Sequence, residues 1–568
     1  RCVSNFSIEV IQHMQDEKFP AKLIRICNTN NQQSIFDTPS QRLNKPGTFD
    51  DMVTDFGNYR WLGTHKDHSI LKTYLMDRMG TGRKIDVLGW QPEGFWVWNN
   101  MVITPENERV EIDDNGIFTL NNVCYYVPSA NSLYAKNPYK FSGQKKFVSL
   151  ESKVSFRDYG EQLIRVHKTR AINLILYSIT CMFRDVIISH FNNFPILFLY
   201  GPAGTGKDEI VKASSAFFGV KREGINLESG ISTQKAQIRE FAQFFNSLVH
   251  LSEYKKGDHD GMIKGLWDNT GYKRGTLDSH VSNESIPLLS GVILTGNEHP
   301  DQAPVITRFI WEEFYKNEFS KEESHQFEIL EKMINDGLSS LTNEILIHRG
   351  LFIKQFEKKY KWYKKEYTTR IEGIHSRVAH NISILAGVYE SLKDVIEFPF
   401  NFSQMNEHFI DGVKKQQRKL ESSSIINKWW DCFIASLRGS MVDQLMINRD
   451  YKLEGNNLIF NFQNAFTKIQ RQWFTQFREN SPSKSVMMDA LKKQPSFCGP
   501  KNSFRINDSV TSGYMFDLTK TNIKDEFINA INWQMRETGR TQSEDEIETE
   551  KETKEKEIAK QTEIDLKY

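Results

Sequence analysis

The stretch PILFLYGPAGTGKDEIV, Pro195–Val211, decides the fold of this chain. It opens with the run Pro195–Tyr200, which is apolar on both faces, as is typical of a buried parallel strand. The next residues match G-x-x-x-x-G-K through Lys207, and a helical pattern follows directly. Strand, glycine-rich loop and helix in this order predict a phosphate-binding loop in an α/β domain.

The chemistry of this loop suits the phosphates of a nucleotide. Glycines let backbone N–H groups turn inward as a nest, the helix N-terminus adds partial positive charge, and the lysine neutralises the β and γ phosphates. We therefore expect ATP to bind the loop, which consists of Gly201, Pro202, Ala203, Gly204, Thr205, Gly206, Lys207 and Asp208.

The position after the lysine departs from the usual motif. Asp208 stands where Ser or Thr commonly gives a hydroxyl to Mg²⁺, and a second apolar strand, Ser247–Glu253, ends in Ser-Glu where Asp-Glu is usual. One hydroxyl and one carboxylate are therefore still present, but each lies in the loop where the usual motif has the other. We hypothesise that Asp208 and Ser252 hold Mg²⁺ directly or through water; the alternative is a weakened metal site. Glu253 is expected to activate the attacking water as general base.

Two further residues complete the predicted catalytic set. The apolar strand Gly291–Asn297 ends in Asn297, which we expect to contact the γ-phosphate or the water. Arg308, in the sequence Thr-Arg-Phe, is a candidate arginine finger for the nucleotide of a neighbouring subunit, and a structural salt bridge explains it equally well.

Composition bounds the architecture and the compartment. A chain of 568 residues with 39% hydrophobic residues exceeds one core, so two to four domains are expected. The net charge of +1 neither demands nor excludes a nucleic-acid partner. Six scattered cysteines without a CxxC pair indicate neither a zinc site nor a disulfide framework. The absence of a long apolar run predicts a cytoplasmic protein with no membrane partner.

The predicted fold class is a multidomain α/β protein with a central parallel sheet. A β-rich or α+β module is expected over 1–153, the P-loop core over 159–320 and a helical region over 321–420. In 422–540 a helix near Ser483–Lys493, turns at Pro495, Gly499 and Pro500 and two strands are compatible with a winged helix. The Glu- and Lys-rich segment 541–568 is expected to be a disordered tail.

Three other segments allow two interpretations. The aromatic strand Phe95–Trp98 can stack bases, but core packing is favoured. Lysines interleaved with Tyr and Trp over Lys358–Arg370 suit a phosphate backbone, whereas a solvated helix with an aromatic inner face is favoured. Asp258–Asp260 is acidic enough for a metal, but the flanking glycines favour an exposed loop.

The ordered motifs FLYGPAGTGKDEI, VHLSEYKK, WDNTGYKRGTLDSH, VILTGNEHP and ITRF resemble the core of AAA+ ATPases and, by their compact spacing, superfamily 3 helicases. More closely, they resemble the helicase-like ATPases of phage, plasmid and integrated-element primase-helicase proteins. The segment IDVLGWQPEGFWVWNN resembles the module that precedes their ATPase core. The resemblance covers roughly Ile85–Phe319.

This resemblance implies an ATP-dependent DNA helicase or translocase that serves the replication of a mobile genetic element or phage. It implies a homo-oligomeric ring with ATP and Mg²⁺, acting on single-stranded DNA in a bacterial cell or phage-infected host. A primase domain or protein is an expected partner, and a start at Arg1 is compatible with a missing upstream domain.

The resemblance also implies that the loop Trp267–His280 contacts DNA in the channel of the ring. Lys273 and Arg274 lie there in a predicted turn between two glycines, and solvent exposure alone also explains them. Two other functions stay open: a DNA-independent AAA+ ATPase that remodels or loads a protein partner, and a nucleotide-binding scaffold with little turnover.

Overall fold

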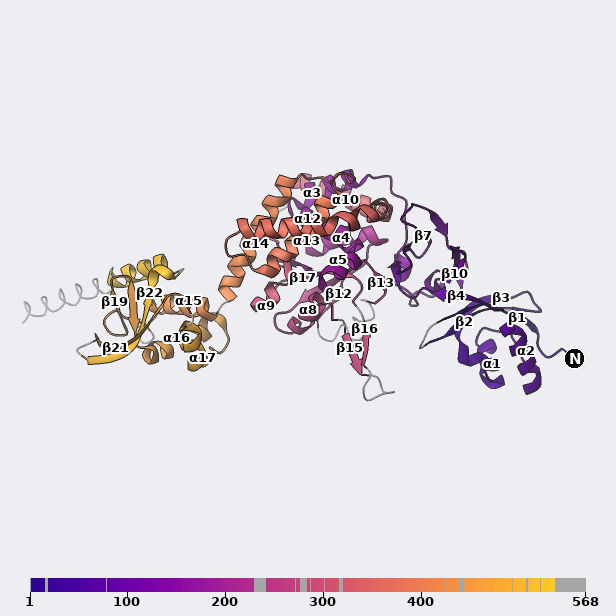
Figure 1. Cartoon of the computed structure of the whole chain (residues 1–568), viewed down its shortest axis with the longest axis horizontal. Helices are drawn as coiled ribbons and strands as arrows, with labels where there is room; N and C mark the ends of the chain where they lie inside the picture. The colour runs from indigo at the N-terminus through magenta and orange to yellow at the C-terminus, as the bar shows by residue number, and fades with distance from the viewer. Residues whose placement is uncertain are drawn as a thin grey trace, which may run out of the picture. The chain divides into compact units, whose positions relative to one another are not determined.

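The computed structural model describes residues 2–15, 19–77, 79–228, 242–270, 272–275, 283–286, 288–300, 302–315, 320–423, 425–438, 444–492, 494–506, 509–521 and 523–536. The chain splits into two compact units, Arg1–Gln417 and Arg418–Tyr568 (Figure 1). It is a mixed α/β protein, as the sequence predicts. The finer division into five segments stays a prediction, and its tail, 541–568, lies outside the described residues.

The first sheet lies at the start of the chain. Its six described strands run in the order β3-β2-β1-β4-β10-β9. Their bounds are Phe6–Met14 (β1), Ala21–Asn28 (β2), Gln33–Pro39 (β3), Gly80–Lys84 (β4), Ile117–Leu120 (β9) and Val123–Tyr126 (β10). Helices α1 (Pro46–Thr54) and α2 (His65–Asp77) contribute to its core, in which Phe36 and Phe49 are almost fully buried.

A second sheet joins this region to the rest of the first unit. Its described strands run β13-β5-β6-β7-β8. Their bounds are Leu88–Trp90 (β5), Trp96–Val97 (β6), Met101–Ile103 (β7), Arg109–Glu111 (β8) and Phe244–Phe245 (β13). Trp96 and Trp98 are fully buried, and the indole N–H of Trp98 donates to Asn343 Oδ1 at 2.8 Å. The favoured interpretation of the aromatic strand as core is therefore confirmed.

The central sheet is parallel. Its five described strands run β12-β14-β17-β11-β18, and every neighbouring pair is parallel. Their bounds are Ile196–Tyr200 (β11), Ile225–Asn226 (β12), Leu248–Tyr254 (β14), Gly291–Gly296 (β17) and Phe309–Glu313 (β18). The chain leaves β11 for the far edge and later returns to its other side as β18. The carboxyl end of β11 is thus a topological switch point, where parallel sheets commonly bind ligands.

Helices surround this sheet in the first unit (Figure 1). Those of the described residues that bear on the argument are α3 (Phe156–His167), α4 (Arg170–Met182), α5 (Arg184–Phe191), α6 (Lys207–Ser215), α8 (Asp260–Trp267), α9 (Ala303–Ile306), α10 (Lys321–Asp336), α11 (Ser339–Leu346), α12 (Arg349–Arg370), α13 (Ser376–Leu392) and α14 (Phe402–Ser423). Taken over the described chain, no single helix has the length and apolar character to cross a membrane. The bent pair α4 and α5 meets that test jointly, by length and composition alone.

Helix α12 shows how the 3.6-residue period sorts its side chains. Tyr360, Tyr363 and Tyr367 recur every three or four residues and are at most 4% exposed. The lysines between them lie on the outer surface or at its edge. The predicted aromatic inner face is therefore confirmed.

The second unit combines helices with an antiparallel sheet. Its described elements are α15 (Ile425–Leu437), β19 (Tyr451–Glu454), β20 (Asn457–Phe460), α16 (Phe462–Phe477), α17 (Lys484–Lys492), β21 (Phe497–Ile506), β22 (Ser509–Asp517) and a helical segment at 524–536. The predicted helix and two strands are present. The predicted turn at Pro495 is confirmed. Those at Gly499 and Pro500 were wrong, because both residues pair with β22 inside β21, where the register shifts.

Candidate nucleotide site

The glycine loop 201–206 joins β11 to α6 at the switch point. Gly204 and Gly206 have φ angles of +76° and +80°, a left-handed region that side chains strongly disfavour. A Cβ on Gly201 would lie 2.3 Å from the carbonyl oxygen of Phe314. The loop conformation therefore needs these glycines, and such turns point backbone N–H groups toward an anion.

Lys207 opens α6 and its side chain folds back over the loop. It is 7% exposed, and Nζ donates to the carbonyl oxygens of Gly201 and Pro202, both at 2.7 Å. A third bond at 3.1 Å reaches Oδ1 of Asn297, directly beyond the end of β17. Lys207 and Asn297, two predicted site residues that are ninety positions apart in the sequence, thus meet at the edge of the sheet.

Glu253 is positioned by a backbone irregularity. The pairing of β14 with β17 shifts register between Leu251 and Tyr254, and Glu253 has a φ of +61°. A non-glycine residue in this region is strained, and bulges beside active sites commonly re-aim a side chain. Burial lowers the pKa of Lys207, and the nearby carboxylates of Asp208 and Glu253 act in the opposite direction. Glu253 therefore lies within electrostatic reach of the lysine.

Asp208 takes part in a network with two residues that sequence reasoning missed. The hydroxyl of Thr295, on β17, donates to Asp208 Oδ1 at 3.0 Å. Nε2 of His250, on β14, lies 3.0 Å from the Thr295 hydroxyl and 3.5 Å from Asp208 Oδ1. Because the hydroxyl proton goes to Asp208, Thr295 accepts from His250, so the imidazole carries its proton on Nε2. Burial lowers the pKa of His250 to about 4, so the ring is neutral at pH 7.

Ser252 lies at the end of β14, next to the edge strand β12. Its carbonyl oxygen accepts from the Leu227 N–H at 2.9 Å, and its side chain is half-buried. In the described chain, the hydroxyl that donates to Asp208 belongs to Thr295. The assignment of Ser252 to a metal stays a prediction, and Thr295 is a hydroxyl in direct contact with the same carboxylate.

Arg308 is buried in its own chain. It is 6% exposed, and its guanidinium pairs with Asp268 Oδ2 at 3.0 Å and donates to the carbonyl oxygen of Pro304 at 2.5 Å. It also lies 5.3 Å from the ring centroid of Trp267. One of the two interpretations, the structural salt bridge, is present in the structure; a role toward a neighbouring subunit stays a prediction.

Lys273 and Arg274 lie in strand β15 (Tyr272–Gly275). This strand pairs antiparallel with β16 (Asn283–Ile286). The predicted turn at these two residues was therefore wrong: they belong to one arm of a hairpin, and the residues between the arms lie outside the described part of the chain. Their contact with DNA stays a prediction.

The acidic stretch Asp258–Asp260 is not a simple exposed loop. Asp258 is exposed, but Asp260 is 4% exposed, begins α8 and accepts a hydrogen bond from the Tyr254 hydroxyl at 2.8 Å. Across the residues that the structure describes, no group of three or more His, Cys, Asp or Glu is arranged to hold a metal ion.

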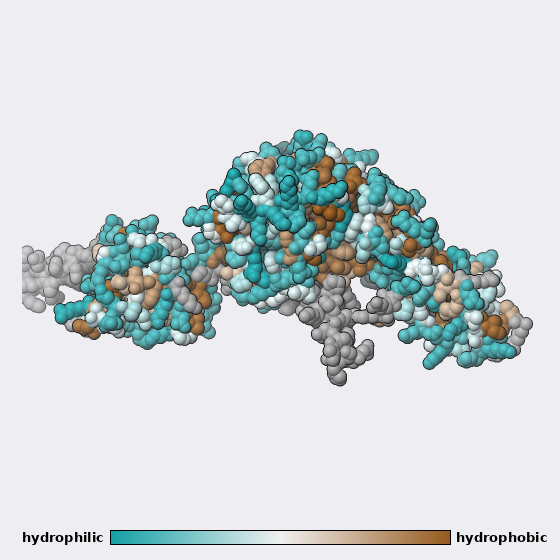
Figure 2. Space-filling view, viewed as in Figure 1, coloured by the Kyte–Doolittle hydropathy of each residue, from teal (hydrophilic) through white to brown (hydrophobic). Residues whose placement is uncertain are grey.

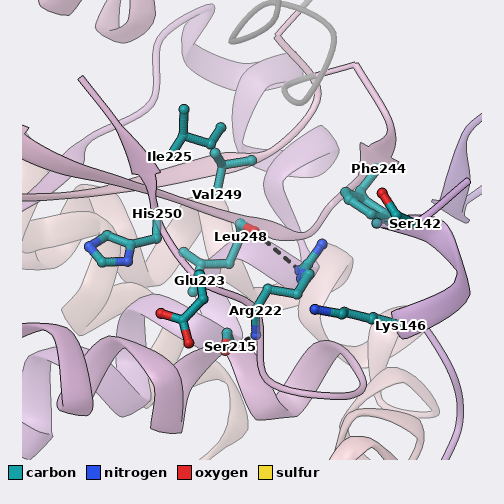
Figure 3. A pocket seen from close by; sticks show the side chains of 11 residues that line it. Ser142, Lys146, Ser215, Arg222, Glu223, Ile225, Phe244, Leu248, Val249 and His250 are labelled. Carbon is teal, nitrogen blue, oxygen red and sulfur yellow. Dashed lines mark hydrogen bonds between the residues drawn. The ribbon is translucent and has the colours of Figure 1, made fainter. Parts of the chain in front are cut away.

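His250 also lines a cavity of about 310 Å³ (Figure 3). Lys146 and Arg222 bring two cations to its lining. Arg222 donates to the Leu248 carbonyl oxygen at 3.3 Å and stacks 4.4 Å from the centroid of Phe244. The polar network that starts at Asp208 thus ends at the wall of this cavity.

One comparison with known proteins is informative about the fold. No protein-family model and no curated protein matches the sequence. Among solved structures, one titled as the active helicase Cch of SCCmec type IV aligns with a TM-score of 0.56 at 14% identity, over 91% of this chain and 94% of that one. The chain therefore shares the fold of that solved structure.

Two more structures align less well. The C-terminal region of NrS-1 gives a TM-score of 0.31 at 10% identity, over 90% of this chain and 95% of that one. A putative ATPase from Cytophaga hutchinsonii gives 0.23 at 14% identity, over 46% of this chain and 94% of that one. Both scores are too low to carry an argument about this chain.

Proposed function

We propose that this chain is an ATP-dependent motor on DNA, a helicase or translocase that couples hydrolysis to movement along a strand. One observation carries the proposal. Lys207, Asp208, Glu253 and Asn297 meet where parallel strands of the central sheet end, in a chain that shares the fold of a solved structure titled as a helicase. Anion-binding loop, ammonium and carboxylate base are the parts that phosphoryl transfer to water requires.

Lys207 and Asn297 are the proposed phosphate contacts. The Nζ bonds to Gly201 and Pro202 keep the ammonium over the loop, and phosphate oxygens are stronger acceptors that would draw it outward. Asn297, held at 3.1 Å from Nζ, contacts the γ-phosphate or the water beside it. Glu253, aimed by the bulge in β14, orients that water and takes its proton.

The residues around Asp208 fit Mg²⁺. Carboxylate and hydroxyl oxygens are the ligands that Mg²⁺ prefers, and it is commonly held by one or two carboxylates together with substrate phosphates. Asp208 is 54% exposed, so its carboxylate is accessible at the mouth of the loop. We assign Asp208 to the metal, with Ser252 or Thr295 as the hydroxyl partner. When bound, Mg²⁺ neutralises charge on the phosphates.

The wider proposal follows the sequence resemblance. The motor belongs to the superfamily 3-like or AAA+ ATPases and serves a phage or mobile element, with a primase domain or protein as partner. It works as a homo-oligomeric ring, in which Arg308 reaches a neighbour's nucleotide and Lys273 with Arg274 contact the strand. The helices and antiparallel ribbon of the second unit support a winged-helix assignment.

The deciding measurement is steady-state phosphate release from the full chain with ATP and Mg²⁺, with and without single-stranded DNA. Lys207→Ala is the control for the site. Stimulation by DNA that vanishes in the control supports the motor. Release that ignores DNA favours the remodeller of a protein partner. ATP binding without release favours the scaffold, to which the unusual Asp208 gives some weight.

A further inference from the structure

The outer face of α12 carries a stripe of cations around one exposed indole. The helix has eight Lys and Arg against two Glu, in a chain whose net charge is +1. Lys354, Lys358, Trp362 and Lys365 follow at spacings of four, four and three residues, which places them on one face. All four are exposed, and Trp362 is 55% exposed. The stripe extends along roughly 16 Å of helix.

The inner face of α12 fixes the direction of this stripe. The hydroxyl of Tyr360 lies 2.5 Å from Nδ1 of His380, and that of Tyr363 donates to Glu390 Oε2 at 3.1 Å. Both partners lie on α13, against which the helix packs. Because these buried phenols are satisfied from inside, the helix cannot rotate about its axis without losing them. The stripe is a rigid surface.

Much of the positive charge on this face is left for a partner. Four cations of the helix are in ion pairs: Arg349 with Asp185, Lys359 with Glu390, Lys361 with Glu357 and Arg370 with Glu366. Lys358 and Lys365 form no ion pair with any described residue. The face of the first unit that Figure 2 shows is mainly hydrophilic, with scattered hydrophobic patches.

A shallow groove of about 360 Å³ runs beside the stripe. It is lined by Tyr360, Lys361, Lys364, Lys365, Thr368 and Thr369. Three ammonium groups along a groove of this kind suit an anionic chain rather than an isolated carboxylate. An apolar partner is disfavoured, because it would have to desolvate these lysines without compensation.

We propose that this face of α12 binds single-stranded nucleic acid, with a base stacked on Trp362 and phosphates on Lys358 and Lys365. A flat aromatic ring between cations matches the alternation of base and phosphate in an unpaired strand. The site is separate from the hairpin that carries Lys273 and Arg274. It rests on the proposed function for the choice of nucleic acid as partner.

The test is the binding of a fluorescein-labelled oligothymidylate to the full chain without nucleotide, followed by anisotropy over a series of salt concentrations. Trp362→Ala is expected to weaken binding about tenfold, the effect of losing one stacked base, and Trp362→Tyr to restore most of it. The double variant Lys358→Ala, Lys365→Ala should make the slope of log K against log salt shallower by about 1.4. Lys332→Ala, at an exposed position of α10, is the matched control.

Unchanged affinity and slope in both α12 variants overturn the proposal, as does a wild-type chain that binds no strand. A protein partner that needs Trp362 while strand binding is unchanged overturns it too. The result is separable from the motor. If strand binding depends on Trp362 but phosphate release is not stimulated by DNA, the motor is refuted and the binding surface on α12 is supported. If DNA stimulates phosphate release but the α12 variants bind the strand as well as wild type, the motor is supported and the binding surface is refuted.

Discussion

Replacing Thr295 with valine removes the hydroxyl that joins Asp208 to His250 and keeps the shape of the side chain. Thr295 is 2% exposed, so no water takes the place of the hydroxyl. The Nε2–H of His250 loses its 3.0 Å acceptor, stays buried, and is left with Asp208 Oδ1 at 3.5 Å, beyond the usual hydrogen-bond distance. A buried donor without a partner costs about 1–3 kcal/mol. Asp208 is 54% exposed, so water replaces its lost bond and adds little to this loss.

Amide hydrogen exchange in β14 and β17 measures this loss locally, which avoids treating a multidomain chain as two-state. A cost of about 1–3 kcal/mol corresponds to exchange roughly 5 to 150 times faster. Thr295→Ser keeps the hydroxyl and should lose only a methyl group's packing. The second variant His250→Phe, combined with Thr295→Val, removes the unpaired donor and should recover part of the loss. Exchange in Thr295→Val equal to that in Thr295→Ser would refute the hydrogen-bond network.

Three further outcomes are expected. Glu253→Gln should bind ATP normally and release phosphate at least about a hundredfold more slowly, because the amide cannot take a proton; equal rates would exclude Glu253 as the base. The pKa of His250 is about 4 in the folded chain and near 6.5 when unfolded, so its contribution to stability is complete above pH 6.5 and falls by about 3 kcal/mol as the pH drops to 4. Unfolding of wild type and His250→Phe across this range should show a weaker acid dependence in the variant. Asp268→Asn leaves the buried guanidinium of Arg308 without its carboxylate and should lower the thermal midpoint of the isolated chain; an unchanged midpoint would show that the pair has no structural role.

The features that were predicted correctly are those that residues close together in the sequence determine. The run from Pro195 to Lys207 specifies strand, turn and helix start within a few residues, so local pattern is enough. The same holds for α12, whose Tyr360 and Tyr367 follow the helical period. The position of Asn297 at the end of an apolar strand was predicted correctly, because a strand that ends in a polar residue marks the carboxyl edge of a parallel sheet. Its contact with the nucleotide stays a prediction.

The network around Asp208 could not be predicted in the same way. It depends on the register between β14 and β17, which brings His250 opposite Ile293 and Thr295 within reach. Two signals were available in the sequence. One is a histidine inside the apolar strand β14, and the other is a threonine one residue before the end of the apolar strand β17. Lys273 was assigned to a turn for a related reason: the glycines beside it are a local signal, whereas the strand is fixed by pairing with β16.

The pairing of β13 with β5 limits how this protein can be divided. Phe244 lies next to Leu88, and a Cβ on Gly89 would lie 2.0 Å from the carbonyl oxygen of Phe245. A shortened protein starting at residue 159 would therefore lose the strands with which β13 forms a sheet. Only two residues separate β13 from β14, the strand that carries Glu253. Expression of the central sheet alone should give aggregates, and recombination during evolution would have to transfer both regions together.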